Sequence, residues 1–217
     1  MPFSVLPRSR RARWRFAVLL SVFFVLAGWH LGLPAARTLV YTPQEGDLVF
    51  QSLPHNPLID AIEGCTGSPY SHCGIVARRG DKWVVVEAVG PVKETPLFSW
   101  IRQGRRSGLA VYRLTRDLER IPALIAEARA MVGRPYDIHY ALDDGAIYCS
   151  ELIWKAWNRA GGTPLGSLTT LGDLNWRPHE AVIRRIENGG LPLDRPMITP
   201  VEITRDPRLT EILRQGF

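Results

Sequence analysis

The sequence comprises 217 residues, of which 46% are hydrophobic and 22% are charged. This composition is typical of a folded protein and excludes a chain that is disordered throughout. The length suits one domain whose core is large enough to be stable without disulfide bonds. The formal net charge is +6 at pH 7.

The positive charge is concentrated at the N-terminus, where residues 1–36 contain five arginines and no acidic residue. Without these arginines, 22 basic residues face 21 acidic residues, which leaves a net charge of +1. The rest of the chain therefore has no excess of basic residues for binding nucleic acid, and we expect no nucleic-acid partner.

An apolar run, Phe16–Gly28, follows the arginine cluster. A basic head before an apolar run is typical of a secretory signal peptide or of an uncleaved membrane anchor, and the sequence leaves both open. If the segment is retained, we expect residues 16–33 to contact the membrane. In both cases residues 1–36 are a targeting segment, and residues 37–217 form the functional domain outside the cytoplasm, in the periplasm or cell envelope.

Short strands dominate the first half of this domain. LVFQS, residues 48–52, predicts a strand. Residues 52–70 are rich in Pro, Gly and Asn and predict a loop with one turn of helix at Leu58–Glu63. The β-rich runs His72–Arg78 and Lys82–Val89 predict a hairpin.

Helices follow in the second half, after a strand predicted at residues 109–114. Apolar residues at helical spacing predict a helix over Pro122–Val132, with Pro in its first turn and Gly133 just beyond its end. A second helix is predicted over Cys149–Ala160, before two glycines. The last 50 residues predict only a weak helix at 180–187 and a short strand near 197–203, and their role stays open.

Two of the three cysteines lie in predicted elements. Strand residues alternate between faces, so Cys73 points away from His72 and is expected to be a small core residue. Cys149 opens a helix whose apolar residues Leu152 and Ile153 face the core. In this first turn the unpaired N–H groups and the helix dipole favour a thiolate, as a cysteine nucleophile requires. The alternative is that Cys149 is a buried structural cysteine.

His72 is the candidate base for this thiol, and an imidazole base needs a third group to orient it. Glu87 lies in the middle of an apolar strand, where a carboxylate is costly unless it is paired. With Arg79-Gly80 as the turn, His72 lies directly opposite Glu87. A register shift of two residues leaves them diagonal on one face, whereas a shift of one separates them. Asp47 and Asp137 are the competing orienting groups.

These motifs together resemble a known family. GDLVF at 46–50 and SHCGIV at 71–76 are similar to strand motifs of NlpC-type, papain-like cysteine amidases. The histidine strand precedes YCSEL at 148–152, which reverses the usual order and resembles the circularly permuted YiiX/YaeF-type branch. The resemblance covers residues 46–160. It implies an α+β fold in which an antiparallel sheet or barrel packs against helices, with the nucleophile at a helix N-terminus.

The resemblance also implies site roles. Cys149 matches the nucleophile, His72 the base and Glu87 the orienting group. Tyr148 is expected to line the oxyanion site or the substrate groove. Tyr136 and Asp137 match a pair that forms a pocket wall or supports it by hydrogen bonds. No metal or other cofactor is implied.

Three functions remain open. The first is a thiol hydrolase that cleaves an amide bond of a cell-envelope peptide through a Cys-acyl intermediate. The second is a lipid-directed thioesterase or acyltransferase at the membrane, which an apolar tunnel beside Cys149 would favour over a polar groove. The third is a non-catalytic envelope binding module. A disulfide between Cys65 and Cys73 would leave Cys149 as the free thiol, and the sequence carries no information on the oligomeric state.

Overall fold

The computed structural model describes residues 41–217. The expected targeting segment, residues 1–36, lies outside this part of the chain. Within residues 41–217, no helix combines the length and the apolar character needed to cross a membrane.

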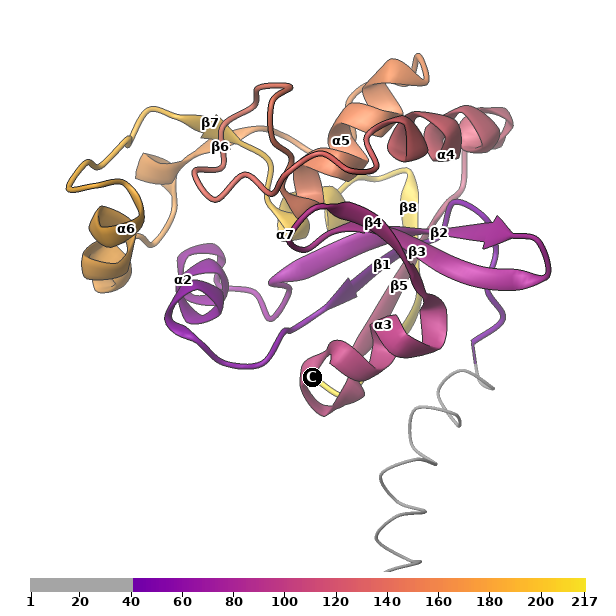
Figure 1. The fold of residues 1–217 in the computed structure, drawn as a ribbon, viewed down its shortest axis with the longest axis horizontal. Helices are drawn as coiled ribbons and strands as arrows, with labels where there is room; N and C mark the ends of the chain where they lie inside the picture. The colour runs from indigo at the N-terminus through magenta and orange to yellow at the C-terminus, as the bar shows by residue number, and fades with distance from the viewer. Residues whose placement is uncertain (1–40) are drawn as a thin grey trace, which may run out of the picture. The chain divides into compact units, whose positions relative to one another are not determined.

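A six-stranded antiparallel sheet forms the centre of the fold, in the order β4-β3-β2-β1-β5-β8 (Figure 1). Its strands, in chain order, are β1 (Leu48–Gln51), β2 (His72–Arg79), β3 (Lys82–Ala88), β4 (Val92–Pro96), β5 (Leu109–Leu114) and β8 (Leu209–Gln215). The predicted strands at 48–52 and 109–114 and the predicted hairpin are all present. The α+β class is confirmed.

Each face of the sheet has its own hydrophobic core. On one face, α4 (Ile121–Ala130) and α5 (Cys149–Arg159) pack against alternate strand residues such as Phe50 and Ile75. On the other face, α3 (Leu97–Gln103) covers residues such as Val76 and Val85 with Trp100. Figure 1 shows α3 on the side of the sheet away from α4 and α5. Successive strand residues therefore face different cores, as the alternation of side chains requires.

The helix α5, which carries the candidate nucleophile, has a strongly amphipathic sequence. Leu152, Ile153, Ala156 and Trp157 recur at helical spacing and are fully buried against the sheet and α4. Gly161, with φ +77°, lies just beyond its C-terminal end, where a left-handed residue stops a helix. The predicted range Cys149–Ala160 is thus confirmed to within one residue.

The region between β1 and β2 differs from the predicted loop. Residues Pro57–Thr66 form a ten-residue helix, α2, instead of one turn. Asn56 caps its start by accepting hydrogen bonds from the N–H groups of Leu58 and Ile59, both at 3.0 Å. Gly67 ends it in the left-handed conformation. The Pro and Gly that suggested a loop are therefore the two ends of this helix.

The C-terminal region contains a small sheet and two further helices. The strands β6 (Thr169–Thr170) and β7 (Pro196–Met197) pair, and α6 (Glu180–Ile186) matches the predicted weak helix. The predicted strand near 197–203 is wrong beyond Met197, because Thr199 accepts a hydrogen bond from Glu202 N and caps the short helix α7 (Pro200–Thr204). β8, which the sequence did not predict, returns to the main sheet beside β5.

Candidate active site

The first turn of α5 places Cys149 at the end of a buried helix. The side chain of Glu151 accepts a hydrogen bond from the backbone N–H of Tyr148 at 3.1 Å, which caps the helix start. Cys149 is 3% exposed and belongs to the core between α5 and the sheet. The helix dipole therefore acts on a thiol that is shielded from bulk water.

His72 is the first residue of β2, and it meets Glu87 of β3 across the hairpin. Gly80 and Asp81 form the turn, so Gly74 lies opposite Glu87 and His72 lies diagonal to it. The predicted turn at Arg79-Gly80 is therefore wrong, and the register differs from the predicted one by two residues. A shift of two preserves the face, so the two side chains still meet.

The carboxylate of Glu87 holds the imidazole firmly. His72 Nε2 lies 2.5 Å from Glu87 Oε2, and both side chains are at most 2% exposed. Thr95 donates its hydroxyl to the other carboxylate oxygen, and Gln103 Nε2 donates to Oε2 at 3.0 Å. Because Nε2 is engaged, Nδ1 is the ring nitrogen that remains for the thiol of Cys149. His72 also lies beside Trp100, with ring centroids 5.9 Å apart.

The thiol and the imidazole shift each other's proton affinity. Burial lowers the pKa of His72, but hydrogen bonds with Cys149 and Glu87 and the charges of both groups outweigh burial and raise the pKa to about 9. Burial raises the pKa of Glu87, and its hydrogen bond from His72 reverses this effect, so the net pKa is lowered. The site thus favours a protonated imidazole beside an ionised carboxylate.

The Cys149 thiol has a pKa well below its usual value. A hydrogen bond from the Cys73 side chain is the largest cause, burial opposes it, and the hydrogen bond and positive charge of His72 add to the lowering. Together, these shifts favour a thiolate–imidazolium pair, which is the reactive form of a cysteine nucleophile.

Cys73 is a buried core residue, as predicted, but it also contacts the candidate nucleophile. Strand alternation predicts only that Cys73 faces away from His72. The contact of Cys73 with Cys149 depends on how α5 packs against β2. Cys65 and Cys73 are both free thiols, so the suggested disulfide does not form.

The competing orienting groups, Asp47 and Asp137, have other partners. Asp47 is fully buried and binds the hydroxyl of Tyr41 and the guanidinium of Arg113. Asp137 accepts hydrogen bonds from the backbone N–H groups of His139, at 2.8 Å, and Ala141, at 2.6 Å. It therefore shapes the loop before α5, and its predicted role at the site stays a prediction.

Three tyrosines surround the start of α5. The hydroxyls of Tyr136 and Tyr140 lie 3.3 Å apart, and the ring of Tyr140 packs on that of Tyr148 with centroids 5.0 Å apart. Burial is the main cause that raises the pKa of Tyr136, and the nearby Cys149 adds to it. Tyr148 is fully buried, and its hydroxyl accepts the N–H of Ile198. Its role at the oxyanion site or substrate groove stays a prediction.

Sequence reasoning missed the residues that donate hydrogen bonds to the Glu87 carboxylate. Thr95 lies on β4 and Gln103 ends α3, and neither element was predicted. Tyr140, which has a φ of +55°, was also missed. The positive φ depends on the loop that Asp137 organises, and no local sequence pattern indicates it.

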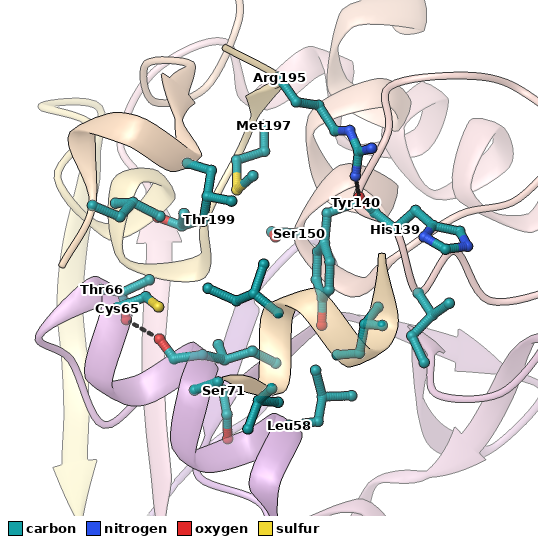
Figure 2. A pocket seen from close by; sticks show the side chains of 18 of the residues that line it. Leu58, Cys65, Thr66, Ser71, His139, Tyr140, Ser150, Arg195, Met197 and Thr199 are labelled. Carbon is teal, nitrogen blue, oxygen red and sulfur yellow. Dashed lines mark hydrogen bonds between the residues drawn. The ribbon is translucent and has the colours of Figure 1, made fainter. Parts of the chain in front are cut away.

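A pocket that is partly open to solvent lies beside Cys149 and Ser150. Figure 2 shows side chains from α2, from the loop before α5 and from the C-terminal region turned toward this space. The lining is mostly aliphatic and includes Leu58, Ala61 and Ile62 of α2 and Val182, Ile183 and Ile186 of α6.

The lining also contains an ion pair. Arg195 binds both carboxylate oxygens of Glu187, at 2.6 and 3.0 Å, and also donates to the backbone oxygen of His139. All three residues line the pocket. Since the charges of Arg195 and Glu187 neutralise each other, the wall that faces the space is predominantly apolar.

Comparisons with known proteins agree with this architecture. The family model described as permuted papain-like amidase enzyme, YaeF/YiiX, matches residues 42–213. The uncharacterized protein YiiX of Escherichia coli is 32% identical over 187 residues, which cover 84% of this chain and 92% of that protein. A crystal structure of YiiX superposes with a TM-score of 0.76 at 32% identity and covers 81% of this chain and 99% of that chain.

YiiX is described as a metalloprotein in that crystal structure. Within residues 41–217 of the present chain, no three His, Cys, Asp or Glu side chains are grouped so that they would hold a metal ion together. The described residues therefore do not fit a metal site of this kind.

The family model matches residues 42–213, and the fold is shared with YiiX. The chain therefore belongs to the permuted papain-like amidase family of the YaeF/YiiX type, as the sequence motifs predicted.

Proposed function

We propose that this chain is a cysteine hydrolase that cleaves an amide bond, with Cys149 as nucleophile, His72 as general acid and base, and Glu87 as the group that orients His72. The observation that carries the proposal is the buried His72–Glu87 pair at 2.5 Å beside a thiol at a helix start. Membership of an amidase family supports a hydrolase role.

The reaction divides into two steps. The Cys149 thiolate attacks the carbonyl carbon and forms a tetrahedral oxyanion. The backbone N–H of Cys149 at the helix start is a candidate donor to this oxyanion. The C–N bond then breaks, and the His72 imidazolium gives its proton to the leaving amine. In the second step neutral His72 takes a proton from water, and the hydroxide hydrolyses the thioester and releases the acid and the thiolate.

A cell-envelope location agrees with the sequence of residues 1–36 and is part of the proposal. The substrate would then be an envelope peptide, and the mature domain would act outside the cytoplasm. Cell fractionation of the full chain, with and without residues 1–36, tests the location. Recovery of the full chain in the cytoplasm would contradict it.

A second candidate, a lipid-directed thioesterase or acyltransferase, is favoured by the apolar pocket beside Cys149. Aliphatic walls bind alkyl groups by removing their surface from water, and they offer few hydrogen bonds to a peptide stem. In the acyltransferase, a second nucleophile replaces water in the deacylation step.

The deciding experiment screens peptidoglycan fragments, N-acyl amides and acyl esters with wild type, Cys149→Ala, His72→Ala and the control His55→Ala. His55 is an exposed histidine that binds Asp60 on α2. We expect turnover in wild type and in His55→Ala and none in the two site variants. Full turnover by Cys149→Ala would reject the proposal, and the preferred substrate class separates the two candidates.

A further inference from the structure

The backbone of Ile198 is held by the two side chains that flank the nucleophile in sequence. Its N–H donates to the hydroxyl of Tyr148 at 2.9 Å, and its carbonyl oxygen accepts the hydroxyl of Ser150 at 2.8 Å. The first turn of α5 and a segment about 50 residues further along the chain are thus joined by two hydrogen bonds. We call this pair of bonds the clasp.

The clasp is buried, because Tyr148 is 0%, Ser150 1% and Ile198 1% exposed. Removing either hydroxyl takes away a partner that the structure supplies to the buried backbone of Ile198, and an unmade hydrogen bond of a buried group costs free energy. Phe at 148 would lack the acceptor, and Ala at 150 would lack the donor. Both hydroxyls are therefore needed to satisfy the backbone of Ile198.

The segment held by the clasp forms one wall of the pocket. Residues 197–200 all line the space that Cys149 and Ser150 also line, and we call them the 197–200 wall. Figure 2 shows Met197 and Thr199 turned toward this space, near Ser150. The wall is the junction between β7 and α7, which Thr199 caps.

The clasp is anchored on a well-fixed part of the molecule. Glu151 caps the N–H of Tyr148, and Lys155 lies 2.8 Å from the carboxylate of Glu151. The ring of Tyr148 is also packed against Tyr140. A wall bound to these residues keeps its position relative to the thiol, as a precise binding site requires.

We propose that Tyr148 and Ser150 are positioning residues that hold the 197–200 wall against the nucleophile and thereby determine which apolar group fits beside Cys149. This inference rests on the proposed function, because it takes Cys149 to be the reactive thiol. It gives the C-terminal region a role in substrate selection.

The test compares two alkylating reagents on the full chain. Iodoacetamide is small and reports the reactivity of the thiolate, whereas N-hexyl iodoacetamide must also place an alkyl chain in the pocket. The rate of labelling at Cys149 is followed by mass spectrometry in wild type, Tyr148→Phe, Ser150→Ala and the control Tyr41→Phe. The variant Tyr41→Phe also loses a buried hydrogen bond of a tyrosine hydroxyl, the one to Asp47, but residue 41 does not line the pocket.

In wild type we expect the hexyl reagent to react about tenfold faster than iodoacetamide, which corresponds to about 1.4 kcal/mol. The ratio of the two rates should fall at least threefold in Tyr148→Phe and in Ser150→Ala and stay unchanged in Tyr41→Phe. An unchanged ratio in both clasp variants, or no preference in wild type, overturns the inference. If Tyr148→Phe does not fold, Ser150→Ala decides.

The same data separate this inference from the proposed function. If Cys149 in wild type reacts with iodoacetamide no faster than the buried Cys65, the proposed function fails. If Cys149 reacts rapidly and His72→Ala slows it, but the ratio does not depend on the clasp, the inference alone fails. A lower melting temperature without a change in the ratio would assign the clasp a purely structural role.

Discussion

Replacing Glu87 with Gln removes the negative charge of the carboxylate that binds His72 and keeps the shape of the side chain. The amide oxygen of Gln still accepts from His72 and Gln103, and its NH₂ group donates to the hydroxyl of Thr95. The geometry at 2.5 Å from His72 Nε2 is therefore preserved, and the change isolates the electrostatic contribution of the carboxylate.

The size of the effect follows from the two kinds of hydrogen bond. A hydrogen bond to a charged group contributes about 1.5–3 kcal/mol, against about 0.5–1.5 kcal/mol for a neutral one, so the imidazolium loses about 1–1.5 kcal/mol of stabilisation. One pKa unit corresponds to about that energy. We therefore expect the pKa of His72, now raised to about 9, to fall by about one unit in Glu87→Gln.

The assay is a pH titration of ¹³C-labelled histidine by NMR, with His72 assigned from the spectrum of His72→Gln. The control is Glu94→Gln, which removes a carboxylate on neighbouring β4 that binds Arg79 and Arg129. The control variant should leave the pKa of His72 unchanged. An unchanged pKa of His72 in Glu87→Gln would refute the argument that the carboxylate charge stabilises the imidazolium.

Three further predictions concern stability. Burial raises the pKa of Asp206, but hydrogen bonds from Arg208 and from the N–H of Gly166 outweigh burial and lower the pKa to about 2. The ionised carboxylate therefore stabilises the fold above its ordinary pKa of 3.8, and this contribution is lost as the pH falls toward 2. Asp206→Asn should lower the free energy of unfolding, measured in urea, by about 1–2 kcal/mol at pH 7 and by less near pH 2. An equal loss at both pH values would contradict the link between the Asp206 pKa and stability. Asn56→Ala removes the cap of α2 and should cost about 1 kcal/mol, with faster amide exchange confined to that helix; exchange unchanged in α2 would show that the cap is dispensable. Leu152→Ala leaves a cavity in the core beneath α5 and should cost about 2–5 kcal/mol in thermal unfolding, and a loss below about 1 kcal/mol would mean that the core collapses to fill the space.

Local sequence patterns were sufficient for the strongly periodic elements. The hairpin, the strand at 109–114 and α5 were predicted because their own residues alternate or recur at helical spacing. His72 and Glu87 come together because side chains two residues apart on a strand share a face, which made the prediction of their pairing tolerant of a two-residue error in the register.

The two missed strands of the main sheet, β4 and β8, lack such a pattern. β4 has the sequence VKETP, with only its first residue fully buried, and β8 carries exposed and half-buried residues along its length. Both are edge strands, so their pairing with β3 and β5 depends on the sheet already being formed. No window of their own sequence indicates it.

The residue pattern alone predicted the side chains of the candidate site: a thiol at a helix start, and an imidazole and a carboxylate on one face of a hairpin. The surroundings of these side chains depend on the tertiary fold. The contact of Cys73 with Cys149, the support of Glu87 by Thr95 and the apolar pocket all depend on how separate elements pack together. Periodicity reports the face of one element, whereas such contacts arise only when several elements form a common core.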